Sequence, residues 1–243
     1  MDRLTQHVVL LLLGAYVLQV ALTDAHLAYV RAGFRPFLLI AAAVLLGVGG
    51  LGLLRSWRAR RTTGEGGGPR EHGHGAPPVS WLLLLPAVVL ALVAPPALGA
   101  FTVTRQSQPA ELPSGAVAAP RLGPDDPGRD HRTVPVNTYR LAALADDPAA
   151  LEGRRIRLTG FVTPREGGGW YVSRIAIACC AADAVGLTVV VDGERGDLAT
   201  DQWVEVIGTW APPARHPAGG YPEAVIDPVS VRPIDPPADT YED

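Results

Sequence analysis

The chain has 243 residues, of which 48% are hydrophobic and only 19% are charged. An ordinary soluble domain carries about 25% charged residues, and the apolar excess here is concentrated in residues 8–100. This distribution excludes a wholly soluble enzyme, a collagen-like fibre and a coiled coil. Residues 1–100 carry 8 Arg against 4 acidic residues, a net charge of +4, whereas residues 101–243 carry 13 Arg against 20 acidic residues, a net charge of −7.

Three segments are candidates for membrane-spanning helices. A span needs about 20 mostly apolar residues, and residues 34–54 and 81–100 meet this length. Residues 8–22 are shorter, but the segment reaches Val30 if its polar end lies in the membrane interface. The sequence therefore predicts a transmembrane region over residues 1–100, with spans at about 8–30, 34–54 and 81–100. The alternative for the first span is the apolar core of a signal peptide.

Arginines near the ends of the spans predict the orientation in the membrane, because cytoplasmic loops are enriched in basic residues. The loop between the second and third spans holds Arg55, Arg58, Arg60, Arg61 and Arg70. We therefore expect a multi-pass protein of the cell membrane with its N-terminus and the linker 55–80 in the cytoplasm. After three crossings, the C-terminal domain would be extracytoplasmic.

The cytoplasmic linker contains His72 and His74 in a stretch rich in Gly and Pro. Such a composition is typical of flexible linkers. Two His residues two positions apart can hold a metal weakly, but zinc sites use three or four protein ligands. We interpret the pair as part of a solvated linker, with a weak metal site as the alternative.

The C-terminal half has the pattern of a small all-β domain. Residues 101–133 lack periodicity and indicate a flexible tether, and the domain at 134–243 begins with a predicted helix at 137–144. Five segments then alternate as strands do: 154–163, 170–180, 187–191, 203–210 and 224–231, the last broken at Asp227-Pro228. Five short strands with Gly160 and Gly208 as bending points favour an OB-like five-stranded barrel. A five-stranded sandwich is the alternative. The expected core residues are Ile156, Leu158, Phe161, Ile175, Ile177, Val189, Val204 and Val206.

The charge of this domain argues against one common role of OB barrels, which is nucleic-acid binding through a basic groove. An acidic domain outside the membrane would repel a phosphate backbone, so we predict no nucleic-acid partner. The sequence shows no Ser/His/Asp set, phosphate-binding loop or paired-carboxylate site. We therefore expect no enzymatic activity.

The residues of the β-domain with the most distinctive chemistry are the adjacent Cys179 and Cys180, followed by Asp183. Successive side chains of a strand point to opposite faces, so a strand through both cysteines would bury Cys179 and separate the sulfurs. A strand that ends at Cys179 could instead be followed by a turn that brings both sulfurs to one side. Three interpretations stay open: buried structural thiols, a metal, metalloid or redox site, and a strained vicinal disulfide in an oxidising compartment.

We predict that Cys179, Cys180 and Asp183 form the functional centre of the domain. Thiolates bind soft ions, so a soft metal or metalloid at the cysteine pair is the cofactor that we consider. Asp183 would be a further ligand or a turn residue. Two thiols and one carboxylate leave a tetrahedral site one ligand short, and His216 or a partner's side chain would have to complete it.

Several stretches together resemble one family, the small subunit of a predicted two-component bacterial permease. Around the spans these are the segment from Tyr29-Val30 to Pro36-Phe37-Leu38, the His-containing linker, and the two ends of the third span at 81–86 and 95–100. In the β-domain they are Gly160-Phe161-Val162, the stretch Cys179-Cys180-Ala181-Ala182-Asp183-Ala184, and residues 202–210. The double-Cys stretch is the most specific of these motifs.

The resemblance implies an accessory membrane subunit whose partners are a larger permease subunit and the lipid bilayer. The outer β-domain would contact that permease or its substrate. Large subunits of this kind resemble permeases that export organic arsenic compounds, which makes an outer thiol site of interest. The alternative function is a membrane-anchored, thiol-based metal-binding or redox protein.

Overall fold

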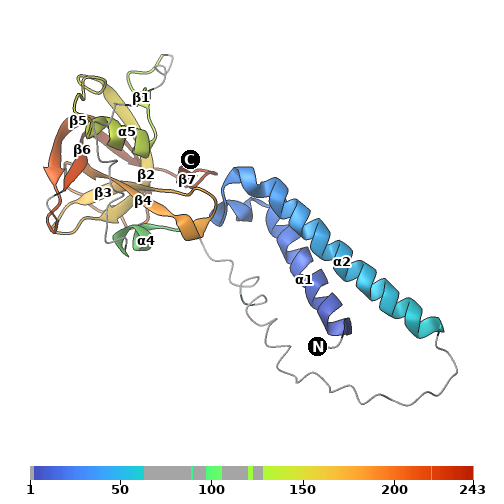
Figure 1. The fold of residues 1–243 in the computed structure, drawn as a ribbon. Helices are drawn as coiled ribbons and strands as arrows, with labels where there is room; N and C mark the ends of the chain where they lie inside the picture. Colours follow the sequence, from blue (N-terminus) through green and yellow to red (C-terminus); the bar gives the residue numbers. More distant parts are fainter. Residues whose placement is uncertain are drawn as a thin grey trace. The chain divides into compact units, whose positions relative to one another are not determined.

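The computed structural model describes residues 3–62, 89, 97–105, 120–122, 128–219 and 221–242. The chain divides into two compact units, Met1–Pro96 and Ala97–Asp243 (Figure 1). His72, His74 and most of the expected third span at 81–100 lie outside the described residues, as does the greater part of the linker 55–80.

The first unit contains two long helices, α1 (Arg3–Leu22) and α2 (Arg35–Thr62), with two short 3₁₀ helices, η1 (Asp24–Ala28) and η2 (Ala32–Phe34), between them. Both α1 and α2 are long and apolar enough to cross a membrane. The first is shorter than the expected span 8–30, because the chain leaves the α-helix at Leu22 and forms η1. The second continues past the expected end at residue 54.

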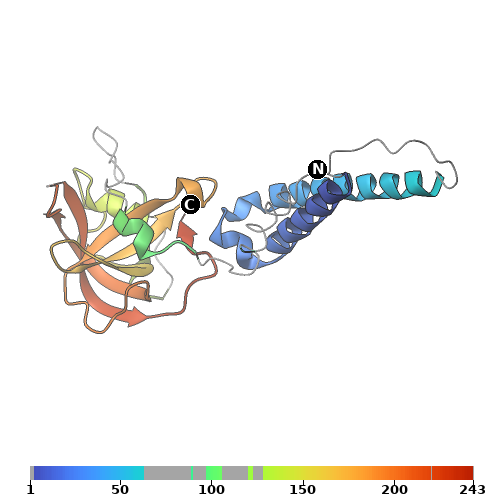
Figure 2. The ribbon, with the colours of Figure 1, turned by 90° about the horizontal axis from the view of Figure 1, so that it is seen from below.

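Small residues allow α1 and α2 to pack side by side, as Figure 2 shows. Ala21 and Ala42 are fully buried. A side chain added at Gly49 would press on Leu11, and one at Gly52 would overlap the ring of His7. Such residues let membrane helices approach closely.

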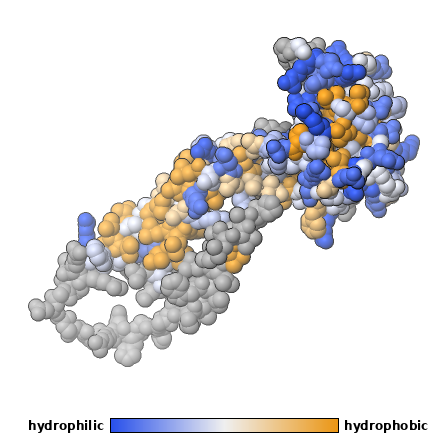
Figure 3. Space-filling view, turned by 180° about the vertical axis from the view of Figure 1, so that it is seen from behind, coloured by the Kyte–Doolittle hydropathy of each residue, from blue (hydrophilic) through white to orange (hydrophobic). Residues whose placement is uncertain are grey.

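The outer surface of α2 is apolar over much of its length, and apolar side chains cover the described helices in Figure 3. Its exposed large side chains recur at helical spacing: Phe37, Ile40, Val44, Val48 and Leu51, each more than half exposed. Soluble proteins rarely expose an apolar stripe of this length. The stripe therefore suits contact with lipid or with another membrane helix.

The second unit is a closed barrel of five strands, β2 (Arg155–Pro164), β3 (Trp170–Ala176), β4 (Val185–Val191), β5 (Trp203–Arg215) and β6 (Pro222–Pro233). The hydrogen-bonded order is β2-β5-β6-β4-β3, and β3 pairs with β2 to close the ring. Every pair in the ring is antiparallel except β4 with β6. This is the OB-like barrel that the sequence predicts, and the closed ring excludes the sandwich.

Two short strands and two short helices complete the unit: β1 (Arg132–Thr133), β7 (Tyr241–Glu242), α4 (Ala100–Arg105) and α5 (Val136–Ala143). The predicted helix at 137–144 is α5, which packs against the barrel through its buried Tyr139. The Tyr139 hydroxyl donates a hydrogen bond to the carbonyl oxygen of Val225 at 2.6 Å. All eight expected core residues are at most 3% exposed.

Several boundaries differ from the sequence prediction; strand β5, for example, continues to Arg215 rather than ending at residue 210. Ala97–Ala100, assigned to the third span, and Val103, assigned to the tether, pack with Phe161 and Tyr241 in a second apolar cluster of the barrel unit. Strand β3 ends at Ala176 rather than at Cys180. Strand β6 continues through Asp227-Pro228, because a register shift opposite Gly208 takes up the irregularity.

The barrel leaves no room for a side chain at Gly160. At the next residue, Phe161, β2 pairs with both β5 and β3, and a Cβ at Gly160 would overlap the carbonyl oxygen of Ser173. We expect Gly160→Ala to lower the free energy of unfolding by about 1–3 kcal/mol, because the backbone has to shift. Urea denaturation of the full chain in detergent, followed by tryptophan fluorescence, measures this loss.

The matched control is Gly193→Ala, since the nearest atom to a Cβ at Gly193 is Pro228 Cγ at 3.5 Å, an ordinary contact. This variant should unfold at nearly the urea concentration of the unchanged chain. Equal midpoints for the two variants would contradict the tight approach of β2 to β3.

Candidate functional site

The two cysteines lie on an exposed turn between β3 and β4, here called the cysteine turn (Ala178–Asp183). Strand β3 stops at Ala176, and the buried Ile177 anchors the start of the turn in the second apolar cluster. The backbone N–H of Ile177 donates to the carbonyl oxygen of Glu242. From there the chain leaves the sheet, so Cys179 is exposed and Cys180 is partly buried.

Asp183 holds the cysteine turn together. Its carboxylate accepts backbone N–H bonds from Ala178 at 2.9 Å, from Cys179 at 2.8 Å and from Cys180 at 3.4 Å. Residues 181–183 form a single 3₁₀ turn, in which the Cys180 sulfur in return accepts the N–H of Asp183. Successive backbone N–H groups that surround an anion are a recurring anion-binding arrangement, and here the anion is the chain's own carboxylate.

The turn places the two sulfurs on one side. Cys179 Sγ and Cys180 Sγ are 3.6 Å apart, and both thiols are free. Together with a carboxylate oxygen of Asp183 they form a group whose ligand atoms all lie within 4.8 Å of one another, close enough to hold one metal ion. Of the two arrangements considered from the sequence, a strand through both cysteines that buries Cys179 is wrong, because β3 ends at Ala176 and Cys179 is exposed.

The carboxylate also sets the protonation of the exposed thiol. A hydrogen bond to Asp183, and a weaker one to Cys180, raise the pKa of Cys179 to about 12. The same contact with Cys179 lowers the pKa of Asp183. Cys179 is therefore a neutral thiol at neutral pH, and an ion that binds to its sulfur has to displace a proton.

His216, considered as a fourth ligand, does not join the cysteines. Its ring stacks on Tyr221 with 4.5 Å between the centroids, and its Nδ1 accepts the backbone N–H of Ala218. In the described parts of the chain, the cysteine group contains no histidine. The site thus offers two sulfurs and one carboxylate whose oxygens already accept backbone hydrogen bonds.

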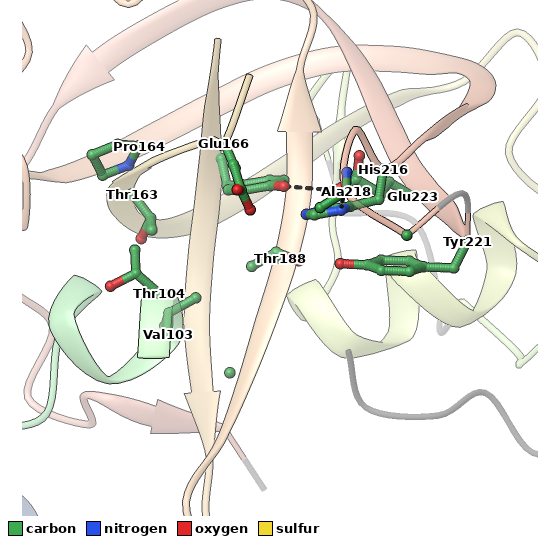
Figure 4. A pocket seen from close by; sticks show the side chains of 13 residues that line it. Val103, Thr104, Thr163, Pro164, Glu166, Thr188, His216, Ala218, Tyr221 and Glu223 are labelled. Carbon is green, nitrogen blue, oxygen red and sulfur yellow. Dashed lines mark hydrogen bonds between the residues drawn. The ribbon is translucent and has the colours of Figure 1, made fainter. Parts of the chain in front are cut away.

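A second feature, which the sequence patterns do not indicate, is an open cavity of about 430 Å³ on the barrel surface (Figure 4). At one side lies Glu223, which is 6% exposed. Its carboxylate accepts a hydrogen bond from the Tyr171 hydroxyl at 2.6 Å and forms an ion pair with Arg165 at 2.7 Å. Burial and the bond to Glu223 raise the pKa of Tyr171. The lining residues come from separate stretches of the chain, so no single stretch of the sequence indicates the cavity.

One known protein family matches the β-domain. Residues 137–241 match the DUF1980 C-terminal domain, an uncharacterised family. The match runs from α5 to the start of β7 and includes the cysteine turn, which agrees with the expected family of uncharacterised membrane proteins. No curated protein and no solved structure shows significant similarity to the chain.

The contact between Asp183 and Cys179 has a measurable consequence for thiol reactivity. Asp183→Asn removes the negative charge that raises the pKa of Cys179, so the thiolate fraction at pH 8 should increase. Because the thiolate is the reactive form, we expect alkylation of Cys179 by iodoacetamide to become at least about tenfold faster, even after the lower nucleophilicity of a less basic thiolate is allowed for. Mass spectrometry of the labelled peptide measures the rate.

The control is Asp192→Asn, a charge change in an exposed loop, which should leave the rate as it is. A rate that also stays the same in Asp183→Asn would show that the carboxylate does not control the thiol.

Proposed function

We propose that this chain is an accessory membrane subunit of a permease, and that its β-barrel presents Cys179 and Cys180 as a paired-thiol site for a soft metal or metalloid ion. The observation that carries this proposal is the 3.6 Å distance between two free sulfurs on an exposed turn. The role is one of binding rather than catalysis.

The incomplete ligand set supports transfer rather than storage. Structural zinc sites are closed by four protein ligands, whereas the cysteine turn supplies two sulfurs and the partly occupied carboxylate of Asp183. Soft ions such as Cu(I) favour thiolate ligands, and trivalent arsenic shares this preference. An ion held by two sulfurs at an exposed position keeps coordination sites open, so a ligand of a partner protein can take it over.

The helices support attachment to a larger membrane protein. The apolar stripe of α2 from Phe37 to Leu51 faces outward, and the α1–α2 pair buries few of its own large side chains. Two helices packed side by side enclose no transport path, so the path would belong to the partner. Arg55 and Arg58 near the end of α2 favour a cytoplasmic position for that end. A third crossing between Thr62 and Ala97 would then place the barrel outside.

Ion binding tests the thiol part of the proposal. The reduced full chain in detergent, titrated with Cd²⁺ or arsenite without oxygen, should bind one ion and develop a sulfur-to-ion charge-transfer absorbance. Cys179→Ser and Cys180→Ser should each weaken binding more than tenfold, because each removes one of the two sulfurs. The double variant should not bind, and its thermal unfolding should stay near that of the unchanged chain, since the turn is exposed.

His216→Ala is the matched control for this titration, because the structure places His216 away from the cysteine group. It should bind the ion as the unchanged chain does. If the double serine variant still binds one ion with the same affinity, the thiol site is wrong.

Co-purification tests the permease part independently. The tagged chain, extracted in a mild detergent, should bring down one multi-span membrane protein in a fixed ratio. The double serine variant should retain this partner, because the helices and not the cysteines hold it. A Phe37→Ser, Val44→Ser variant on the outer face of α2 should lose it. A chain that purifies alone would refute the subunit role while leaving the ion site intact.

A further inference from the structure

We propose that the barrel carries a second binding site, in the cavity of Figure 4, and that this site takes a small organic cation with an ammonium or guanidinium group. The residues that line the cavity do not include the cysteines or Asp183. The proposal is therefore independent of the ion site on the cysteine turn.

The cavity is built from four parts of the barrel unit. Its walls come from α4, the end of β2 with the turn that follows, the faces of β3 and β4, and the hairpin between β5 and β6. Its volume of about 430 Å³ falls within the roughly 300–1,000 Å³ of small-molecule sites. A ligand of up to a few tens of atoms fits this space.

The charges on the wall are negative. Glu223 is buried and balanced by Arg165, which is not among the lining residues. Glu166 also lines the cavity, and within the described part of the chain it has no ion pair and no hydrogen bond. The charges of Glu223 and Glu166 add to burial in raising the pKa of Tyr221. The wall thus carries one uncompensated carboxylate and favours a positive ligand.

The polar atoms on the wall are mostly hydrogen-bond acceptors. The Tyr221 ring is held by its stacking on His216, at an angle of 14° between the planes, and the side chain reaches into the cavity on the side of Thr188 in Figure 4. The phenol oxygen can accept a hydrogen bond, as can the carboxylate of Glu166. Ammonium and guanidinium groups carry only donors, so they complement this wall.

Besides the charge of the wall, the buried hydroxyl of Thr163 also indicates a ligand. It is fully buried, lines the cavity near Thr104, and its hydroxyl has no hydrogen-bond partner among the described residues. A buried hydroxyl without a partner lowers stability, which a folded protein tolerates where the group has another use. A ligand N–H that reaches this end of the cavity would supply the missing partner.

The test uses methylguanidinium and its neutral isostere methylurea as probes, with the full chain in maltoside micelles, which carry no cationic group. Amide signals of Ala218 and Gly219, next to His216, report binding in an NMR titration. Methylguanidinium should give saturable shifts, and methylurea should bind at least about tenfold more weakly. Glu166→Gln should weaken methylguanidinium binding on the order of fivefold, because it removes one exposed charge partner.

Three further variants, of which two are controls, separate binding from folding. Glu152→Gln changes an exposed carboxylate outside the lining and should leave binding unchanged. Thr163→Val should weaken binding several-fold without lowering the melting temperature, because the hydroxyl has no partner to lose. The Cys179→Ser, Cys180→Ser double variant should bind the cation normally.

Three outcomes would overturn the proposal: no saturable shift with methylguanidinium, equal binding of methylurea, or methylguanidinium binding that Glu166→Gln does not affect. Loss of ion binding by the cysteine turn would not bear on it.

Discussion

The short strand β7, Tyr241–Glu242, ties together parts of the barrel unit that are far apart in the sequence. The Glu242 carboxylate accepts the backbone N–H groups of Val136 and Asn137 at 2.7 and 2.9 Å, where its charge stabilises the start of α5. The same carboxylate lies 3.7 Å from the guanidinium of Arg174 on β3, which also donates to the Tyr241 carbonyl oxygen. The Glu242 carbonyl oxygen accepts the N–H of Ile177, directly before the cysteine turn. Glu242 thus helps to fix the backbone at Ile177, from which the cysteine turn starts.

The two candidate sites use a carboxylate in opposite ways. The Asp183 carboxylate accepts three backbone N–H bonds, so it shapes the turn, and its contact with Cys179 keeps that thiol protonated. Glu166 has no partner in the described chain, so its charge is available to a ligand. A soft ion would need sulfur ligands, whereas an organic cation would need oxygen acceptors, and the two candidate sites share no residue.

Sequence patterns predicted what depends on local periodicity: two long apolar helices, five strands, and core residues such as Ile156 and Val206. These patterns failed where contacts with residues far apart in the sequence determine the structure. Ile177 continues the alternation of apolar residues in β3, but it lies beyond the end of the strand and is buried in a cluster with residues of α4 and β7. The alternation therefore does not extend to Cys179. The sequence analysis assigned Ala97–Ala100 to the end of a membrane span, because apolar residues occur both in spans and in protein cores. The cavity depends on side chains from α4 and four strands, so no single stretch of sequence indicates it.

The segment that enters the barrel unit is also part of a ligand wall. The chain arrives at Ala97, and two hydrogen bonds fasten it: Leu98 N–H to the Tyr241 hydroxyl at 3.0 Å and Ala100 N–H to Asp201 at 2.5 Å. Only a few residues later, Val103 and Thr104 of α4 face the cavity. A six-residue helix is only about 9 Å long, so the fastened start of α4 and its cavity-lining residues lie close together. A displacement of the chain at Ala97 would therefore also move Val103 and Thr104, and with them one wall of the cavity.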